Sequence, residues 1–431
     1  MTNKAVISNR IYFGVTPERA KEIMDILTYK IETVRDAKGR FNTIELIRNY
    51  KIPAKGVISV PQGRLDLIPE GAEIVDKRSI VPAVFPEPKF ALFPDQQEVY
   101  DKVTDTVFIN ALVGWGKTMT ALHLARKFSQ KTLVITHNTM LRDQWIGEIK
   151  KLYGIDAGII GSGKCDLDAI IVVGNVQTVT KMVTQLADKF GTVILDEAHH
   201  VPADTFGKII DGMRARYRIA LSGTLNRKDG KQVLFKDYFG SNIIKPKQSN
   251  TINPTIHTLK TGMRLLPGVP WVKKINALLY DYDYQQFIAG VAQRYISKGH
   301  KVLVVASRVE FLQGVKSALG DSALLVVGGT ELKDRQAAEK AINTGSKQAI
   351  VGSSQIFAEG ISINALSCLI LAEPISNDIL LEQLIGRVMR LHDDKLDPVV
   401  VDMHFSGPSE KKQNATRLAF YIQKGWQVVE L

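Results

Sequence analysis

Short apolar runs alternate with helix-period segments through the middle of the chain. Between about Val107 and Gly240, five runs are expected as strands: Val107–Leu112, Thr132–Thr136, Ala169–Val173, Thr192–Leu195 and Arg218–Ser222. Between them lie segments with the apolar spacing of a helix, such as Lys117–Phe128 and Met140–Leu152. Continuous apolar strands separated by helices indicate a parallel sheet covered on both faces.

The same alternation begins again after about Tyr284. The expected strands are Lys301–Ala306, Ala323–Val327, Ala349–Gly352, Cys368–Ala372 and Pro398–Met403. The pattern predicts two α/β units in tandem, over residues 86–240 and 285–431. Residues 241–284 contain four prolines and are expected to form an irregular basic linker.

The first 85 or so residues have a different character. They contain one clear helical pattern, Pro17–Tyr29, scattered β-like pieces and a proline-rich exit at residues 82–88. We expect residues 1–85 to form a small separate α+β accessory domain that helps to choose the substrate. Arg35, Lys38 and Arg40, in an expected turn, could contact that substrate, although a solvated loop on a stabilising domain explains them equally well.

Composition excludes several classes of protein. A chain of 431 residues exceeds one ordinary domain, and 45% apolar with 23% charged residues is typical of globular domains. There is no run of eighteen apolar residues and no apolar signal core after Met1, so an intracellular protein without a membrane span is expected. The two cysteines, Cys165 and Cys368, are read as ordinary small residues in a reducing compartment.

The formal charge of +12 is unevenly distributed. The segment from Ser241 to Lys274 holds six basic residues and no acidic one, and a shorter cluster has Arg214, Arg216 and Arg218 at alternate positions. Such stretches suit a polyanion, because each neutralised phosphate releases counterions. A merely solvated linker explains the longer stretch equally well.

The segment Ala111-Leu-Val-Gly-Trp-Gly-Lys-Thr118 lies between an expected strand and an expected helix. In this context backbone N–H groups at Gly114, Trp115, Gly116 and Lys117 can surround a phosphate at the helix N-terminus. Lys117 would then reach the β- and γ-phosphates of ATP, and the hydroxyl of Thr118 would bind Mg²⁺. The general phosphate-loop pattern has glycine at the position of Ala111, so this segment departs from it there. The structural alternative to a phosphate-binding loop is a glycine-rich turn with a chance Lys-Thr pair.

A second acidic segment follows the expected strand Thr192–Leu195. It reads Asp196-Glu-Ala-His199 and lies at the carboxyl end of the strand, which is the edge of a parallel sheet where ligands bind. Asp196 can hold Mg²⁺, and Glu197 can polarise the water that attacks the γ-phosphate. Two acids and a histidine near the start of a helix at about Pro202 would be the structural alternative.

These two segments together resemble those of superfamily 2 helicases, and further motifs follow in the family's order. Phe93-Pro-Asp-Gln96 resembles the adenine-reading motif, with Gln96 as the base contact. The resemblance implies strand contacts at Thr136, His137 and Asn138, in a segment that runs on to Gln144 and Trp145, and at Gln177 and Thr178. Ser222-Gly-Thr224 is similar to the element that couples hydrolysis to strand movement.

The second unit carries the remaining motifs. Residues 351–366 resemble the fifth motif and imply strand contacts at Ser353, Ser354 and Gly360. Gln383-Leu-Ile-Gly-Arg387-Val-Met-Arg390 is similar to the sixth, and helical spacing would put Gln383, Arg387 and Arg390 on one face. The resemblance implies that the two arginines neutralise charge on the γ-phosphate, with Gln383 near the attacking water. Ser362 departs from the family's usual Asp, and Asn175 and Gly223 are milder departures.

The resemblance covers about residues 90–403 and implies two RecA-like motor domains. The sixth motif differs from the Gln-Arg-x-Gly-Arg-Ala-Gly-Arg pattern of DEAH-box RNA helicases. Residues 222–230 resemble DNA-acting relatives near the XPB and type III restriction groups, and the compact plan with Val60-Pro-Gln-Gly-Arg64 resembles phage branch-migration helicases of the UvsW type.

We therefore expect an ATP- and Mg²⁺-dependent enzyme that remodels branched DNA without sequence preference. It is expected to act as a monomer, in the host cytoplasm if it is phage-encoded. Two alternatives stay open: an RNA helicase, and an ATP-gated protein or nuclease motor subunit that clamps duplex without unwinding it.

Overall fold

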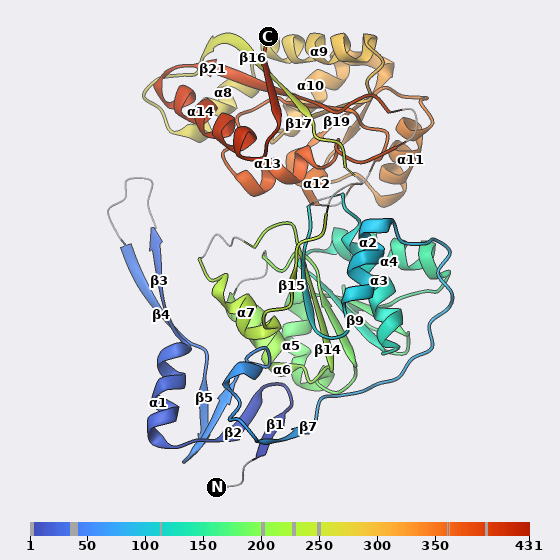
Figure 1. Cartoon of the computed structure of the whole chain (residues 1–431). Helices are drawn as coiled ribbons and strands as arrows, with labels where there is room; N and C mark the ends of the chain where they lie inside the picture. Colours follow the sequence, from blue (N-terminus) through green and yellow to red (C-terminus); the bar gives the residue numbers. More distant parts are fainter. Residues whose placement is uncertain are drawn as a thin grey trace. The chain divides into compact units, whose positions relative to one another are not determined.

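The apolar runs between residues 107 and 222 form a largely parallel sheet in the computed structural model (Figure 1). The structure describes residues 4–34, 42–112, 114–199, 203–225, 230–247, 251–359, 361, 363–392 and 395–431. The chain divides into a first unit, residues 1–111 and 116–247, and a second unit, residues 248–431 together with 112–115.

The central sheet of the first unit has the strand order β11-β10-β12-β9-β13-β14-β8-β15. Its pairs are parallel except β10 with β11. The strands are β8 (Val107–Asn110), β9 (Thr132–Thr136), β10 (Gly158–Gly161), β11 (Lys164–Cys165), β12 (Ile171–Asn175), β13 (Thr192–Leu195), β14 (Tyr217–Ser222) and β15 (Ile243–Ile244). The five predicted strands correspond to β8, β9, β12, β13 and β14.

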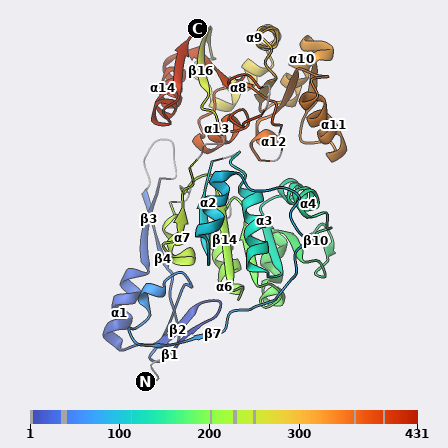
Figure 2. The same ribbon diagram turned by 45° about the vertical axis from the view of Figure 1, so that its right-hand side comes forward.

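Helices cover both faces of this sheet (Figure 2). They are α2 (Pro94–Lys102), α3 (Lys117–Phe128), α4 (Thr139–Tyr153), α5 (Val176–Leu186), α6 (Ala203–Gly212) and α7 (Val233–Phe239). One buried cluster joins α5, α6 and α7 to one face through alternate strand residues such as Leu133 and Ile135. The strands are buried on both faces, which explains why they read as continuous apolar runs.

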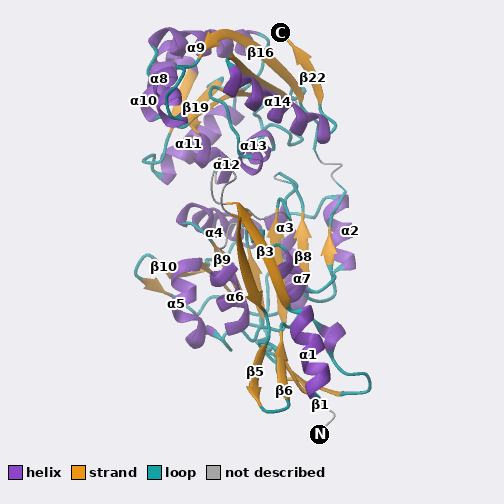
Figure 3. Ribbon diagram, turned by 90° about the vertical axis from the view of Figure 1, so that its left-hand side faces the viewer, coloured by secondary structure: helices purple, strands orange, loops and turns teal. Residues whose placement is uncertain are grey.

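The N-terminal residues form a smaller sheet with the order β5-β6-β2-β1-β7 and its own apolar core around Ile11, Ile23 and Val60. Its elements are β1 (Lys4–Ile7), β2 (Ile11–Gly14), α1 (Pro17–Ile26), β5 (Lys51–Ala54), β6 (Val57–Val60) and β7 (Glu73–Asp76). A separate hairpin of β3 (Thr28–Val34) and β4 (Asn42–Arg48) extends from it (Figure 3). The predicted α+β character is confirmed. The predicted helix 17–29 is too long, because Thr28 already begins β3.

The second unit contains a parallel sheet with the order β18-β19-β17-β20-β21-β16-β22. Its strands are β16 (Thr255–Arg264), β17 (Val302–Ala306), β18 (Ala323–Val326), β19 (Ala349–Ser353), β20 (Cys368–Leu371), β21 (Val399–Ser406) and β22 (Gln427–Glu430). Its helices are α8 (Trp271–Leu279), α9 (Tyr282–Ser297), α10 (Val309–Leu319), α11 (Leu332–Asn343), α12 (Ser354–Glu359), α13 (Asp378–Ile385) and α14 (Pro408–Gln423). The prediction of two RecA-like parallel-sheet domains is confirmed.

The prediction that residues 241–284 form an irregular linker is wrong for most of that segment. β15 pairs with β8 in the first sheet, β16 lies between β21 and β22 in the second, and α8 and α9 follow. The prolines at 254, 267 and 270 stand just outside these elements rather than interrupting them. Only the first half of β16 is buried at alternate positions, so its apolar signal is short.

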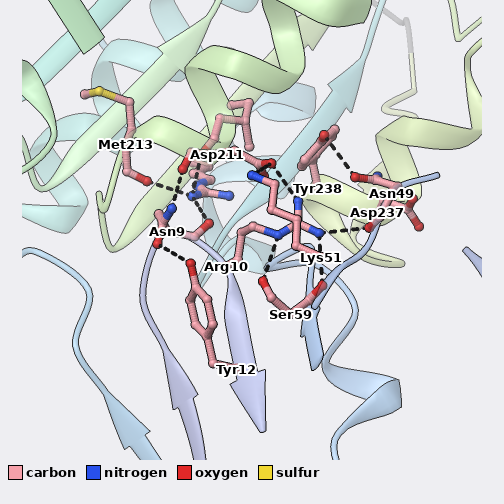
Figure 4. A network of polar contacts seen from close by, with 12 residues as sticks. Asn9, Arg10, Tyr12, Asn49, Lys51, Ser59, Asp211, Met213, Asp237 and Tyr238 are labelled. Atoms are coloured by element: carbon pink, nitrogen blue, oxygen red, sulfur yellow. Dashed lines mark hydrogen bonds and ion pairs between the residues drawn. The ribbon is translucent and has the colours of Figure 1, made fainter. Parts of the chain in front are cut away.

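A buried polar network fixes the N-terminal domain to α6 of the first unit (Figure 4). Arg10 donates hydrogen bonds to Asp211 (2.6 Å), to Ser59 Oγ (3.0 Å) and to the carbonyl of Asn49 (2.8 Å). Lys51 lies 3.2 Å from the same Asp211 carboxylate. Arg218, on β14, donates from Nη2 to the carbonyls of Asn9, Ile210 and Met213, a set that spans both parts. These charges compensate one another only while the two parts stay together.

A second cluster of contacts joins the N-terminal domain to α7 through Asp237. This carboxylate accepts from Asn49 Nδ2 (2.7 Å), Tyr29 Oη (2.9 Å) and Arg64 Nη1 (3.2 Å). The N–H of Gly63 also bonds to the Asp237 carbonyl (2.9 Å). Deleting residues 1–85 would therefore remove charged partners from α6 and α7, so a deletion variant cannot isolate a role of this domain in substrate choice.

Replacing Asp211 with alanine is expected to destabilise the first unit by about 3–5 kcal/mol, because it leaves the buried Arg10 guanidinium without its carboxylate. The measurement is denaturant-induced unfolding of the full chain followed by circular dichroism. The matched control is Glu73→Ala, which breaks the exposed Lys4–Glu73 pair and should cost less than about 1 kcal/mol. Equal stability of the Asp211→Ala variant and the wild type would contradict the role given to the network.

Candidate active site

The loop between β8 and α3 has the backbone geometry of a phosphate cradle. Gly114 (φ +92°) and Gly116 (φ +95°) both lie in the left-handed region that favours glycine. A Cβ atom on Gly116 would lie 2.2 Å from Gln96 Nε2, so glycine is also required there for space. Gly116 caps α3, whose N-terminus therefore faces the loop. Val113 lies outside the described residues.

Two predicted site residues, Lys117 and Gln96, lie against this loop. Lys117 is buried, donates from Nζ to the Ala111 carbonyl (2.9 Å), and lies 3.8 Å from Glu197 Oε1. Gln96 is also buried, and its Oε1 accepts the N–H of Phe93 (3.0 Å), which fixes its amide beside Gly116. Thr118 is the second residue of α3 and is partly exposed.

Asp196 lies at the carboxyl end of β13 and is held on both carboxylate oxygens. Trp145 Nε1 donates to Oδ2 (2.8 Å), and the N–H of Glu197 donates to Oδ1 (3.0 Å). Its own N–H bonds to the Ile135 carbonyl (3.0 Å) and extends the pairing of β13 with β9. Burial, and then the neighbouring Glu197 carboxylate, raise the pKa of Asp196 above its usual range, while the bond from Trp145 acts in the opposite direction.

Glu197 has a backbone conformation that is rare for a residue with a side chain. Its φ of +44° lies in the left-handed region, and such strain gathers at functional sites. Its Oε2 is 3.3 Å from His199 Nδ1, and the same nitrogen is 2.7 Å from Ser222 Oγ. The acidic segment is thus joined directly to Ser222-Gly-Thr224 at the end of β14.

The residues present fit a nucleotide with Mg²⁺. A carboxylate and a hydroxyl, from Asp196 and Thr118, are hard oxygen ligands of the kind that Mg²⁺ prefers. Within the described ranges, no three His, Cys, Asp or Glu side chains are arranged to hold a metal by themselves. A cation at Asp196 would therefore need further oxygens, which the phosphates beside the glycine loop would supply.

The predicted strand-contact residues lie at the carboxyl ends of strands. Thr136, His137 and Asn138 connect β9 to α4, Gln177 and Thr178 lie in the first turn of α5 after β12, and Ser353 and Ser354 connect β19 to α12. Gln177 is exposed, whereas Thr136 and Ser354 are buried. Asn138 Oδ1 caps α4 through the N–H of Leu141 (2.8 Å). Gly360 and Ser362 lie outside the described residues.

The arginines of the sixth motif are not on one helical face, which corrects the prediction. Helix α13 ends at Ile385, and i→i+3 bonds at Arg387 and Val388 tighten the chain into a turn. Arg390 lies beyond that turn, in a bridge with Thr251. Gln383 remains on α13 and is buried, and Arg387 is buried as well. Arg387 Nη2 donates to the Ala358 carbonyl and Arg390 Nη1 to Asn364 Oδ1 (3.2 Å), so both contact the fifth-motif segment.

Several basic side chains of the clusters noted in the sequence have partners within the fold. Arg214 pairs with Asp188 (2.9 Å), Arg216 pairs with Asp105 (2.6 Å), and Arg218 is buried in the N-terminal network. Lys260 pairs with Glu430 and Lys274 pairs with Glu410. Because these side chains have partners within the fold, they give little support to a polyanion-binding stretch.

Two contributors were missed as site residues by sequence reasoning. Trp145 and His199 both belong to motifs recognised in the sequence, yet their contacts with Asp196 and Ser222 join segments 51 and 23 residues apart. Periodicity gives no signal for such contacts.

Comparisons with known proteins identify the family of this chain. Residues 89–227 match the family model of the type III restriction enzyme res subunit, and residues 286–392 match the helicase conserved C-terminal domain. The protein named "Probable helicase D10" of Escherichia phage T5 is 42% identical over 437 residues, which cover 99% of this chain and 96% of that protein. Several viral relatives at 24–27% identity carry helicase names, some of them as RNA helicases.

Two more distant comparisons bear on the family and the fold. The ATP-dependent DNA helicase uvsW of Enterobacteria phage T4 is 25% identical over 342 residues, 72% of this chain and 67% of that protein. The structure of S. cerevisiae Dbp5 bound to RNA and ADP BeF3 covers 78% of this chain and 89% of its own, with a TM-score of 0.57 at 13% identity. Among the described residues, no helix has the length and apolar character needed to cross a membrane.

The two family models and the 42% identity to the phage T5 protein, which extends over 99% of this chain, show the family. The chain belongs to the superfamily 2 helicases, a family of ATP-dependent enzymes.

Proposed function

We propose that this helicase uses ATP hydrolysis to remodel branched DNA, such as forks, D-loops and four-way junctions. The observation that carries the proposal is that Lys117, Asp196 and Glu197 lie at the same edge of the first unit's sheet as two candidate strand-contact segments, residues 136–138 and 177–178. The similarity to phage helicases, one of them named a DNA helicase, supports DNA as the substrate. The sixth motif, which differs from that of DEAH-box RNA helicases, supports the same choice.

The residues at the sheet edge are proposed to divide the chemistry as follows. The amide of Gln96 reads the adenine, and the N–H groups from Gly114 to Lys117 hold the phosphates. Lys117 contacts the β- and γ-phosphates, and Asp196 and Thr118 hold Mg²⁺. Bound there, Mg²⁺ supplies positive charge to the phosphate oxygens as the γ-phosphate leaves.

Glu197 is proposed to orient the attacking water and accept its proton. Glu197 contacts His199, and His199 contacts Ser222. Through these contacts a change at Glu197 during hydrolysis would be transmitted to the Ser222-Gly-Thr224 element. Arg387 and Arg390 of the second unit neutralise the developing charge, with Gln383 near the water. ATP binding then brings the units together on a strand, and hydrolysis releases that grip.

Strand contacts at Thr136, His137, Asn138, Gln177, Thr178, Ser353, Ser354 and Gly360 are proposed to be mainly to the phosphate backbone. Binding would then be insensitive to sequence and would weaken as salt rises. The N-terminal domain is proposed to contribute to substrate choice while fixed to α6 and α7. Its exposed basic residues on the hairpin, Lys30 and Arg48, are opposite the hairpin face that packs on the buried cluster of α5, α6 and α7.

A substrate panel tests the proposal. ATPase activity and strand displacement are measured with a forked duplex, a four-way junction, single-stranded DNA and a tailed RNA duplex, each with ATP and with a non-hydrolysable analogue. We expect branched DNA to stimulate the ATPase most and strand displacement to require ATP. Stronger stimulation by RNA would favour the RNA helicase alternative, and hydrolysis with no displacement would favour the duplex clamp.

A further inference from the structure

Trp145 connects a nucleic-acid motif to the acidic segment of the ATP site. Its indole is 1% exposed and lies on the inner side of α4, where Nε1 donates to Asp196 Oδ2 (2.8 Å). An indole N–H can only donate, and a carboxylate is a strong acceptor, so the contact is a charge-assisted hydrogen bond. It sets the orientation of the Asp196 carboxylate together with the N–H of Glu197.

The same helix is joined to two of the candidate strand-contact segments. At its start, Asn138 caps the helix, and Thr136 Oγ1 donates to the Asn138 carbonyl (3.1 Å). Further along, Arg142 Nη1 donates to Ser162 Oγ (2.9 Å) and to Asn175 Oδ1 (3.2 Å). Asn175 immediately precedes α5, which begins with the segment that holds Gln177 and Thr178. Helix α4 therefore links both segments to the carboxylate.

Asp196 and α4 are anchored differently, so movement of one relative to the other would act on the indole contact. Asp196 belongs to the sheet through the bond of its N–H to the Ile135 carbonyl. Trp145 belongs to a 15-residue helix held by Asn138 at its start and by buried Ile149 and Leu152 beyond. If a strand bound at the start of α4 displaced the helix relative to the sheet, the distance and angle of the indole contact would change. A hydrogen bond weakens steeply as its distance and angle change, so the shift would alter the position of the carboxylate.

We propose, on the basis of the function proposed above, that Trp145 is a positioning residue that transmits strand binding to Asp196. Metal-binding carboxylates are tuned by the partners that hydrogen-bond to them, and loss of such a partner typically lowers metal affinity or activity by 10–100-fold. The structural alternative is that the bond only satisfies a buried indole N–H. The two explanations differ in whether the geometry of the bond changes when nucleic acid binds.

The test is the Trp145→Phe variant, which keeps an aromatic ring and removes the donor. We expect the ratio of strand-stimulated to unstimulated kcat to fall by about tenfold and the Mg²⁺ concentration for half-maximal activity to rise several-fold. The matched control is Trp426→Phe, which makes the same change at a buried tryptophan packed on Phe420 and Tyr421 and should leave both quantities unchanged.

A spectroscopic measurement on the wild type distinguishes transmission of strand binding by Trp145 from a purely structural role of its hydrogen bond. The chain has four tryptophans, so an ¹⁵N-indole spectrum has four N–H signals, and the variant assigns that of Trp145. We expect this signal to move when an oligothymidylate is added without nucleotide, and to move again with Mg²⁺ and a non-hydrolysable ATP analogue.

Two results would overturn the inference while leaving the proposed function intact. One is an unchanged stimulation ratio in Trp145→Phe. The other is a Trp145 signal that stays fixed while the oligonucleotide binds, as followed by fluorescence anisotropy of the labelled strand. Absence of any strand stimulation in the wild type would instead count against the proposed function.

Discussion

Replacing Glu197 with glutamine is expected to lower ATP turnover by at least about a hundredfold while ATP binding is retained. General-base catalysis typically contributes 10²–10⁴-fold, and an amide of the same shape cannot accept the proton of the attacking water. Glu197 is suited to that role because its strained backbone (φ +44°) and the contact with His199 hold the carboxylate in one place. Lys117, 3.8 Å away, would remain to bind the phosphates.

The measurement pairs steady-state phosphate release with equilibrium binding of a fluorescent ATP analogue. Glu73→Gln makes the same chemical change at an exposed carboxylate of the N-terminal domain and should behave as the wild type. Normal turnover by Glu197→Gln would remove Glu197 from the role of catalytic base.

Replacing Arg387 with alanine is expected to lower kcat by about 10³-fold or more, because an arginine that neutralises charge on the transferring phosphoryl group is worth 10³–10⁵ in kcat. Binding of ATP to the first unit should persist, since the glycine loop, Lys117 and Gln96 are untouched. Arg387→Lys should recover little of the loss, because an ammonium lacks the planar fork of a guanidinium.

The loss must be separated from damage to the second unit, because Arg387 also donates to the Ala358 carbonyl. Thermal unfolding of the variant provides that check, and Arg294→Ala, at an exposed position of α9, is the control for loss of a surface arginine. A well-folded Arg387→Ala variant with turnover within a few-fold of the wild type would rule out an arginine finger at this position.

The sheets could be predicted from the sequence because their strands are buried on both faces. Thr192–Leu195 and Thr132–Thr136 appear in the structure with the predicted bounds, since every residue in them must be apolar or small. β16 was missed because only its first half is buried and prolines stand at both sides. The end of α13 was missed because turn-forming bonds after Ile385, rather than spacing, decide where the helix stops.

The pairing of charged side chains could not be predicted in the same way. Arg216 and Arg218 read as members of one basic cluster, yet the first pairs with Asp105 and the second is buried beside the carbonyls of Asn9 and Ile210. Alternation along a strand places every second residue on the same face but says nothing of what packs there. The motifs placed Lys117 and Asp196 correctly at one sheet edge, and the contact of Asp196 with Trp145 required the fold.

Branch migration of a four-way DNA junction by the wild-type chain, followed together with ATP consumption, tests whether ATP hydrolysis drives strand movement. We expect strands to separate only when ATP is hydrolysed and a non-hydrolysable analogue to support binding alone. The Glu197→Gln variant should bind the junction without moving its branch point. Junction processing that proceeds without hydrolysis, or rapid ATP consumption that never moves a strand, would contradict this expectation.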